Sequence, residues 1–221
     1  MSAADPFVAL FLFSLISACT PGPNNVMLLA SGVNFGFRRT VPHMAGVSIG
    51  FPVMMAAVAL GLGSAFRAEP RIHDVIEVIG VVYLLWLAWK IAAAPVGVEI
   101  GPSAPDAADG RPRSSARPMS FLAAVAFQWV NVKAWIIAIS AVSVYVPESY
   151  TAIGGAALLF GVTLITGVIS TVQWAAFGSL VARFLREPMR LRIFNVTMAA
   201  LLIVSLWPAA VDIAGWFGIR G

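Results

Sequence analysis

Apolar residues fall into six long runs along this chain, and most polar and charged residues lie between the runs. A helix needs roughly 20 predominantly apolar residues to cross the hydrocarbon core of a bilayer, and each run is long enough. The predicted spans cover residues 6–31, 41–66, 74–94, 119–146, 151–180 and 193–217. We therefore expect an all-α integral membrane protein with six transmembrane helices.

The longest connector between runs, residues 95–118, divides the predicted helices into three and three. It is rich in Pro, Gly, Ser and Asp and has no periodicity, which is typical of a flexible linker. Because three is an odd number of crossings, the half at 119–221 has the opposite topology to the half at 1–94. The pattern predicts a single transmembrane domain over residues 1–221, arranged as a 3+3 inverted repeat.

The first predicted helix contains five residues that a continuous helix does not tolerate together: Pro21, Gly22, Pro23, Asn24 and Asn25. Proline has no amide hydrogen, so each of the two prolines leaves a helical carbonyl without its donor. Such backbone is costly in lipid unless it lines a wet cavity or packs against protein. We predict an interrupted helix with a binding site at this position; the alternative is a proline kink that only shapes packing.

Beyond this interruption we expect a second helical segment with Thr20 as its N-cap and Pro21 at its first position. The backbone amides near Gly22, Asn24 and Asn25 would then be donors at a helix N-terminus, which attracts anions. A carboxylate held by such amides is the arrangement found in amino-acid sites between broken transmembrane helices.

The fourth predicted helix carries Gln128, Asn131 and Lys133 near its centre. Lys133 is the only basic residue well inside a predicted span, where a charge costs roughly 3 kcal/mol and needs an internal partner. Candidate partners are the freed carbonyls of the first helix and the carboxylate of a substrate; the alternative is a subunit interface or a bound water. Asn131 and Lys133 diverge by about 200° on a regular helix, so both reach one site only if this helix is also interrupted.

A polar stripe follows one face of the fifth predicted helix, at spacings of three and four residues. Its members are Thr163, Thr166, Ser170 and Gln173. Two roles are open for the stripe, a translocation path or hydrogen bonding between helices of the bundle.

Two glycine pairs have the small-xxx-small spacing that permits close helix packing in membranes. They are Gly32 with Gly36 and Gly46 with Gly50. We expect these glycines to lie at helix contacts and not to touch a substrate.

The composition agrees with a membrane protein: of 221 residues, 60 % are hydrophobic and 11 % are charged, with a formal net charge of +4. The basic residues form short clusters between the apolar runs and no single basic face, so we interpret them as topology signals and expect no nucleic-acid partner. Ten of the 14 basic residues lie in the first, third and fifth connectors, and three lie on the opposite side. Because positive loops stay inside, this asymmetry places both termini outside the cytoplasm.

Residue types that carry metal or acid–base chemistry are scarce. The single cysteine, Cys19, permits neither a disulfide within the chain nor a cysteine metal site. His43 and His73 lie near opposite membrane faces, and we expect His43 at the interface, with proton coupling as its alternative role. Glu77 is the most embedded carboxylate, only about one turn into its helix. The sequence predicts no metal, no cofactor and no enzymatic activity.

The stretch TPGPNNVMLLASGVNFG, residues 20–36, resembles the amino-terminal signature of the LysE/RhtB family of amino-acid exporters. The spans and the basic central linker resemble that family over nearly the whole chain, and NVKAW at 131–135 is similar to its Asn-Pro-Lys-Ala motif, with Val132 in place of proline. The resemblance implies export of amino acids or close derivatives across a bacterial inner membrane, driven by the proton gradient, with both termini periplasmic. By matching position, it implies a substrate site at Pro21, Gly22, Pro23, Asn24, Asn131 and Lys133.

The residue types in the predicted spans do not favour other functions. A metal or cation exporter would need carboxylates for hard ions, or thiolates and imidazoles for soft ones, and the spans are poor in both. An intramembrane enzyme is disfavoured because no Gly-x-Ser-x-Gly elbow occurs. The lack of a deeply embedded acidic residue argues against a dibasic substrate. The sequence does not select one amino acid, and it leaves a homodimer open.

Overall fold

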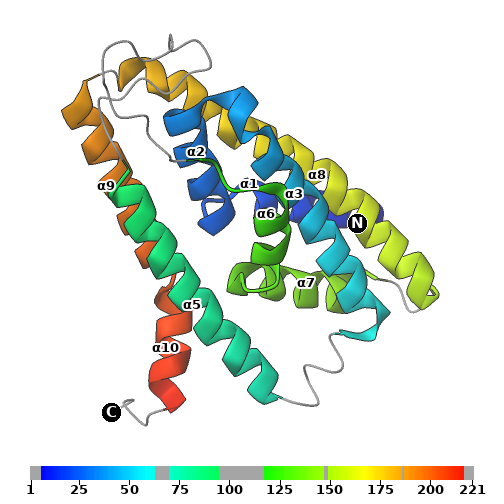
Figure 1. Ribbon diagram of the computed structural model, residues 1–221. Coiled ribbons are helices and arrows are strands. Elements are labelled where there is room, and N and C mark those ends of the chain that lie inside the picture. The colour runs from blue at the N-terminus through cyan, green and yellow to red at the C-terminus, as the bar shows by residue number, and fades with distance from the viewer. Residues whose placement is uncertain (1–5, 63–69, 95–116, 147–148, 186, 217–221) are drawn as a thin grey trace, which may run out of the picture.

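The computed structural model of the protein describes residues 6–62, 70–94, 117–146, 149–185 and 187–216 (Figure 1). Within these ranges every regular element is helical, which confirms the predicted all-α class. The predicted linker at 95–118 lies outside the described residues except for its last two positions.

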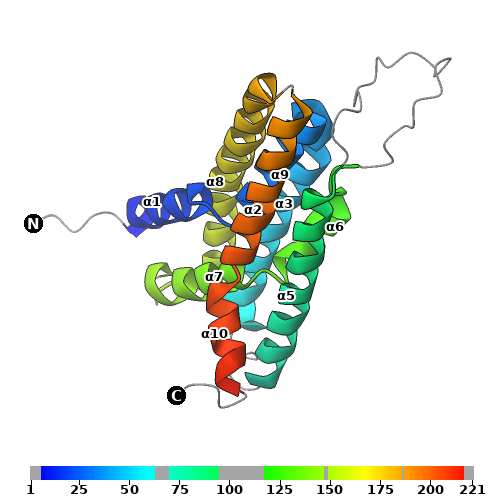
Figure 2. The same ribbon diagram turned by 90° about the vertical axis from the view of Figure 1, so that its left-hand side faces the viewer.

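The first and fourth predicted helices are each a pair of shorter helices. α1 (Pro6–Cys19) and α2 (Pro23–Phe35) meet at 53°, and α6 (Phe121–Gln128) and α7 (Val132–Tyr145) meet at 59°. In Figure 2, α1 and α7 lie across the direction of the long helices. Both bends therefore occur where the sequence places its polar residues.

Three further predicted helices are long and apolar. α3 (Phe37–Ala57) continues into a π-helix, η1 (Val58–Leu62), and α5 covers Pro70–Ala92. α8 (Ala152–Val181) continues into a 3₁₀ turn, η2 (Ala182–Phe184). Within the described ranges, three helices are long and apolar enough to cross a membrane, or up to five if each bent pair is one span.

The sixth predicted span, 193–217, is wrong in its boundaries. It begins earlier and is divided into α9 (Pro188–Val204) and α10 (Trp207–Trp216). Pro188 takes the first position of α9, which suits a residue without an amide hydrogen. Pro208 cannot donate to the carbonyl of Val204, so the hydrogen-bond ladder is broken between α9 and α10.

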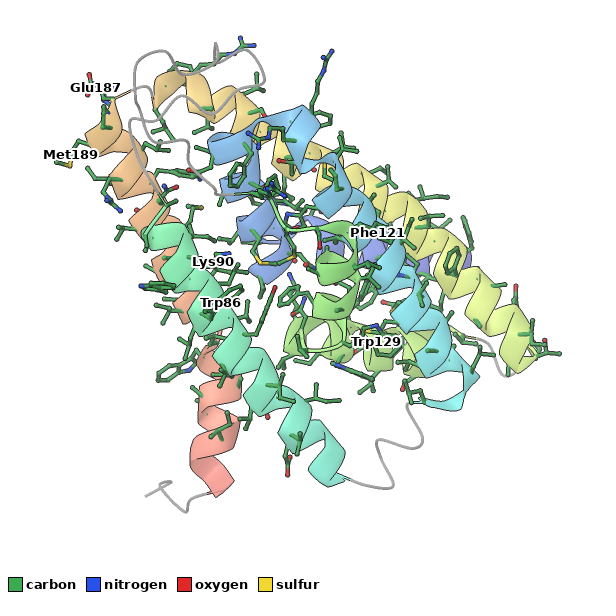
Figure 3. The ribbon with its side chains drawn as sticks, in the orientation of Figure 1. Trp86, Lys90, Phe121, Trp129, Glu187 and Met189 are labelled. Atoms are coloured by element: carbon green, nitrogen blue, oxygen red, sulfur yellow. The ribbon has the colours of Figure 1, made fainter. Side chains whose placement is uncertain are left out.

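The basic connectors gather toward one end of the bundle. In Figure 1 the turn between α2 and α3, the end of α8 and the start of α9 lie at the same end, toward which α5 points its C-terminus. Arg192 of α9 donates a 2.7 Å hydrogen bond to the carbonyl of Ala92 at the end of α5. Near that end of α5, the Lys90 ammonium lies 4.7 Å from the centre of the Trp86 ring (Figure 3).

Glycines set how closely the helices approach. α8 packs against both α2 and α3, and α3 also packs against α6. A Cβ on Gly32 would meet the carbonyl of Ala175 and the Cα of Gly178, and a Cβ on Gly178 would meet the carbonyl of Leu29. The α2–α8 contact is therefore backbone against backbone.

The second glycine pair also behaves as predicted. A Cβ on Gly46 would lie 2.5 Å from the carbonyl oxygen of Phe121, and one on Gly50 would lie 2.8 Å from the Cα of Val125, so both glycines contact α6. For Gly36 the packing prediction is wrong: it has φ 78°, forms the turn between α2 and α3, and would meet nothing within 4 Å. Its backbone conformation, and not close packing, favours glycine there.

We predict that Gly178→Ala lowers thermal stability, because its methyl group would collide with the rigid backbone of α2. Overpacking typically costs about 1–3 kcal/mol, which corresponds to a fall of several degrees in Tm for a chain of this size. Tryptophan fluorescence of the purified protein in detergent measures this change. The matched control is Gly161→Ala on the same helix, where a Cβ meets nothing within 4 Å. Equal Tm values for the two variants would contradict the packing account.

Candidate functional site

The interruption between α1 and α2 begins with a carbonyl that Pro21 leaves without a donor. That carbonyl belongs to Ser17, and it accepts a 2.8 Å hydrogen bond from the Thr20 hydroxyl. Thr20 is therefore not the N-cap of α2, as the sequence predicted. The N-cap is Gly22, with extended backbone and no side-chain hydrogen bond, and Pro23, not Pro21, occupies the first turn. The prediction is off by two residues because both prolines satisfy the same rule.

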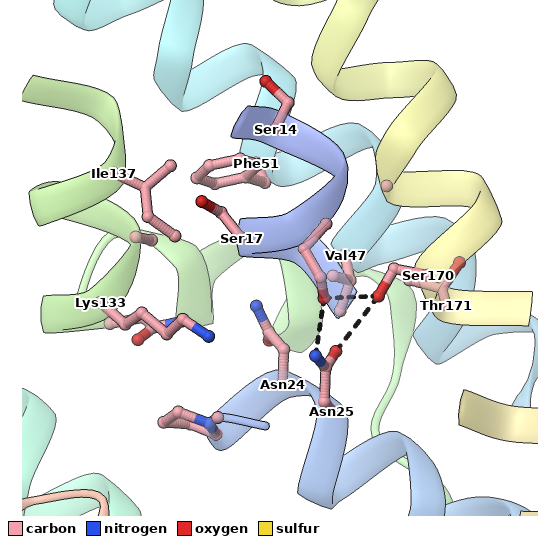
Figure 4. Close-up of a pocket in the computed structure, with 16 residues that line it drawn as sticks. Ser14, Ser17, Asn24, Asn25, Val47, Phe51, Lys133, Ile137, Ser170 and Thr171 are labelled. Carbon is pink, nitrogen blue, oxygen red and sulfur yellow. Dashed lines mark hydrogen bonds between the residues drawn. The ribbon is translucent and has the colours of Figure 1, made fainter. Parts of the chain in front are cut away.

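Asn25 holds the two sides of this interruption together. Its side-chain amide donates to the carbonyls of Ala18 and Thr20, both at 2.7 Å. The hydroxyl of Ser170 on α8 donates to the same Ala18 carbonyl at 2.6 Å and lies 3.4 Å from Oδ1 of Asn25 (Figure 4). The carbonyls at the end of α1 are thus satisfied by side chains of α2 and α8.

Lys133, from the start of α7, also points to the end of α1. Its Nζ lies 3.0 Å from the Thr20 hydroxyl, 3.1 Å from the Thr20 carbonyl and 3.4 Å from the Pro21 carbonyl. No ion pair joins Lys133 to a carboxylate in the described parts of the chain. Its charge is therefore held by neutral oxygens of the broken helix, the first of the two partners that the sequence suggested.

The bend between α6 and α7 forms without a proline. The amides of Trp129, Val130 and Asn131 each bond to the carbonyl three residues earlier, at 3.1–3.3 Å, so the helix tightens before it turns. The Trp129 carbonyl accepts a 2.9 Å hydrogen bond from the indole of Trp135. The Val130 carbonyl packs against Gly80 of α5, where a Cβ would collide with it.

The bend brings Asn131 and Lys133 to one pocket although they are two residues apart. Asn131 is the N-cap of α7 and has extended backbone, φ −89° and ψ 102°, so the regular 200° divergence does not apply. Asn24 of α2 and Gln128 of α6 exchange two hydrogen bonds, of 2.8 and 3.2 Å, between their amide groups. The two interruptions are therefore joined directly.

The pocket between α1, α2, α3, α7 and α8 collects most of the predicted substrate residues. Gly22, Pro23, Asn24, Asn25, Asn131, Lys133 and Ser170 line it. Pro21 and Gln128 do not line it; the Pro21 carbonyl lies 3.4 Å from Nζ of Lys133, and Gln128 is hydrogen-bonded to Asn24. The carboxamide oxygen Oδ1 of Asn131 is buried in the pocket wall and has no hydrogen-bond partner among the described residues.

Comparison with known proteins bears on this geometry. The sequence matches the family described as LysE type translocator over residues 15–205. The chain belongs to the LysE type translocator family. Among its relatives is the cysteine/O-acetylserine efflux protein of Escherichia coli (strain K12), which is 34 % identical over 198 residues, 88 % of this chain and 92 % of the relative. The protein of the same name from Salmonella typhimurium (strain LT2) matches to the same extent, and no solved structure matches.

The comparison confirms the predicted family and the predicted function class, efflux of amino acids or close derivatives by a membrane transporter and not an enzyme. The match covers both interruptions and every residue that lines the pocket except Ser14, which precedes the matched range by one position. Within this LysE type translocator, the described residues contain no group of three or more His, Cys, Asp or Glu side chains placed to hold a metal ion.

The polar stripe of α8 divides in the structure. Thr163 and Thr166 are buried and donate to carbonyls of their own helix, at 2.6 and 3.1 Å, and neither lines the pocket. Gln173 is exposed and its oxygen lies 3.5 Å from the sulfur of Cys19. Of the four stripe residues only Ser170 reaches the pocket.

Several pocket residues were missed by the sequence reasoning. They are Ser14, Ser17, Ala18, Val47, Phe51, Ala134, Ile137, Gly167 and Thr171. The two serines lie three residues apart in the apolar run just before the interruption, and this spacing of polar residues could have indicated that they face the pocket. The apolar residues give no such indication in the sequence.

Two titratable residues are more buried than predicted. His43 was expected at the interface but is 1 % exposed on α3, and neither of its ring nitrogens has a hydrogen-bond partner among the described residues. Glu77 on α5 is also 1 % exposed. Neighbouring helices therefore cover these two residues. The distance of a residue from a predicted span boundary does not reveal such packing.

We predict that Asn25→Ala destabilises the protein, because it removes the side-chain amide that bridges the carbonyls of Ala18 and Thr20 across the interruption. The two carbonyls keep Ser170 and Lys133 as donors, so each lost hydrogen bond costs about 0.5–1.5 kcal/mol and a fall in Tm of a few degrees is expected in detergent. Gln173→Ala, which removes an exposed amide, serves as the control and should leave Tm unchanged. A Tm for Asn25→Ala equal to that of the control would refute the bridging role.

Proposed function

We propose that this LysE type translocator is a secondary transporter that exports a small neutral amino acid, or a close derivative, through the pocket between its two interrupted helices. The observation that carries the proposal is Lys133, a cation that faces the pocket with only neutral oxygens as partners in the described chain. A cation in such surroundings is a strong attraction for a carboxylate.

The carboxylate of the substrate would bind between Lys133 and the N-terminus of α2. Gly22, Pro23 and Asn24 begin that helix and line the pocket, so its positive end faces the same space as the ammonium group. Binding would exchange the contacts of Lys133 with Thr20 for contacts with the carboxylate. Asn24, tied to Gln128, would transmit this exchange to α6.

The ammonium group of the substrate would be accepted by Asn131, whose Oδ1 is buried at the pocket and has no partner among the described residues. A buried acceptor in this condition favours a ligand that donates a hydrogen bond. Among the described residues that line the pocket none is acidic, so these residues offer no partner to a second positive charge on the substrate. This supports a neutral side chain, as in cysteine and O-acetylserine, which give the relatives their names.

The transport cycle extends the proposal to the whole chain. We infer six spans in a 3+3 inverted repeat, in which α1–α2 corresponds to α6–α7, and α9 with α10 forms the last span. One half would rock against the other around the pocket, with both termini in the periplasm and the bacterial inner membrane as the location. Ser170 and Thr171 belong to the proposed path because they line the pocket, whereas Thr163, Thr166 and Gln173 do not line it and are left out of the proposal.

We predict that Lys133→Gln lowers transport of O-acetyl-L-serine and L-cysteine at least about 10-fold, mainly through a higher KM, because the carboxylate loses its charged partner. Gly22→Ala should have a smaller effect in the same direction, since its Cβ would lie 2.9 Å from Cδ and 3.0 Å from Nζ of Lys133 and would displace the ammonium group. Uptake of radiolabelled substrate into proteoliposomes measures both variants.

Gly161→Ala, away from the pocket, is the control for that experiment and should transport like the wild type. Wild-type KM values in a folded Lys133→Gln protein would show that the carboxylate binds elsewhere.

We further predict that export is coupled to protons. Inverted membrane vesicles that contain the protein should accumulate O-acetyl-L-serine when their lumen is made acidic, and an uncoupler should abolish the accumulation. Accumulation that is the same with and without the imposed gradient would contradict the coupling.

A further inference from the structure

Two serines of α1 line the pocket on the side away from the proposed carboxylate site. Ser14 and Ser17 are three residues apart, so their side chains share one face of the helix. In Figure 4, Ser17 lies above Lys133 and Asn24, and Ser14 lies beyond it. The hydroxyl groups therefore stand where the side chain of a bound amino acid would extend.

Ser14 differs from the other buried hydroxyl residues. It is 4 % exposed, and its Oγ has no hydrogen-bond partner among the described residues. Thr163 and Thr166 donate to their own helix, and Ser48 and Thr171 bond to each other at 3.0 Å. A hydroxyl buried in an apolar bundle without a partner is unfavourable, so a ligand that supplies the partner gains affinity.

The walls around the two serines are apolar. Phe51 of α3 and Ile137 of α7 line the pocket and lie close to Ser17 in Figure 4, and Val47 lines it one helical turn from Phe51. The region thus combines an apolar enclosure with two hydroxyl groups. Such a lining suits a short side chain that ends in an oxygen or sulfur atom, and gives no partner to a charged one.

We propose that Ser14 and Ser17 form the side-chain subsite of the transporter and hydrogen-bond the polar side-chain atom of its substrate. The inference rests on the proposed function, because it places the side chain opposite a carboxylate held by Lys133. It narrows the substrate to small neutral amino acids with a hydroxyl, thiol or ester group. A site built to bond such a group rejects the analogue that lacks it, because the hydroxyls of the site are then left unpaired.

The test compares L-serine with L-alanine, which differ by one hydroxyl, as competitors of radiolabelled O-acetyl-L-serine uptake in proteoliposomes. For the wild type we expect L-serine to inhibit at a concentration at least about 10-fold lower than L-alanine. Ser14→Ala and Ser17→Ala should each reduce this preference, because the inhibition constant of L-serine rises and that of L-alanine does not. Ser14→Thr, which keeps the hydroxyl, should retain the preference.

Ser143→Ala is the matched control, because Ser143 is exposed on α7 and does not line the pocket. The subsite is overturned if the ratio of the L-alanine to the L-serine inhibition constant stays at the wild-type value in both Ser14→Ala and Ser17→Ala. It is also overturned if both inhibition constants rise equally, because an equal rise indicates a structural effect. These results are distinct from failure of the proposed function, in which wild-type proteoliposomes take up no O-acetyl-L-serine at all.

Discussion

Carbonyl groups that lose their helical donors inside an apolar bundle must find other donors, and the site depends on this requirement. Pro21 and Pro23 remove two amides from the first span, where water is scarce. Around the interruption, the carbonyls of Ser17, Ala18 and Thr20 accept hydrogen bonds from Thr20, Asn25 and Lys133, respectively. These donors come from α2, from α7 and from the segment between α1 and α2, so satisfying the backbone also brings the walls of the pocket together.

Lys133 links this structural requirement to transport. The same ammonium group that bonds to the end of the first helical segment is the only cation among the described residues that line the pocket. A carboxylate that competes for it would loosen the contact between α7 and the first span, whereas departure of the carboxylate would restore it. The amide pair of Asn24 and Gln128 connects α2 and α6 beside the same point. In the proposed mechanism, substrate binding would be coupled through these few contacts to the relation between the two halves, as alternating access requires.

The sequence was informative where a residue type is incompatible with its surroundings. A Pro-Gly-Pro stretch and a lysine each violate a strong rule in an apolar helix, and the structure bends beside both of them. The sequence failed where several residues satisfy one rule equally, as for the N-cap of α2, which is Gly22 and not Thr20. Tertiary contacts accompany the α6–α7 bend, which has Val132 at the position of the family's proline: the Trp129 carbonyl accepts from the Trp135 indole, and the Val130 carbonyl packs against Gly80. The roles of Ser14 and Phe51 depend on helix packing, which one-dimensional patterns do not contain.

The most direct measurement is an experimental structure of the protein with bound O-acetyl-L-serine, obtained by electron cryomicroscopy or crystallography. Our account predicts the substrate carboxylate within hydrogen-bond distance of Nζ of Lys133 and near the N-terminus of α2, with the contacts between Lys133 and Thr20 lengthened. A substrate bound outside this pocket, with Lys133 still bonded to Thr20 and Pro21, would contradict the central claim.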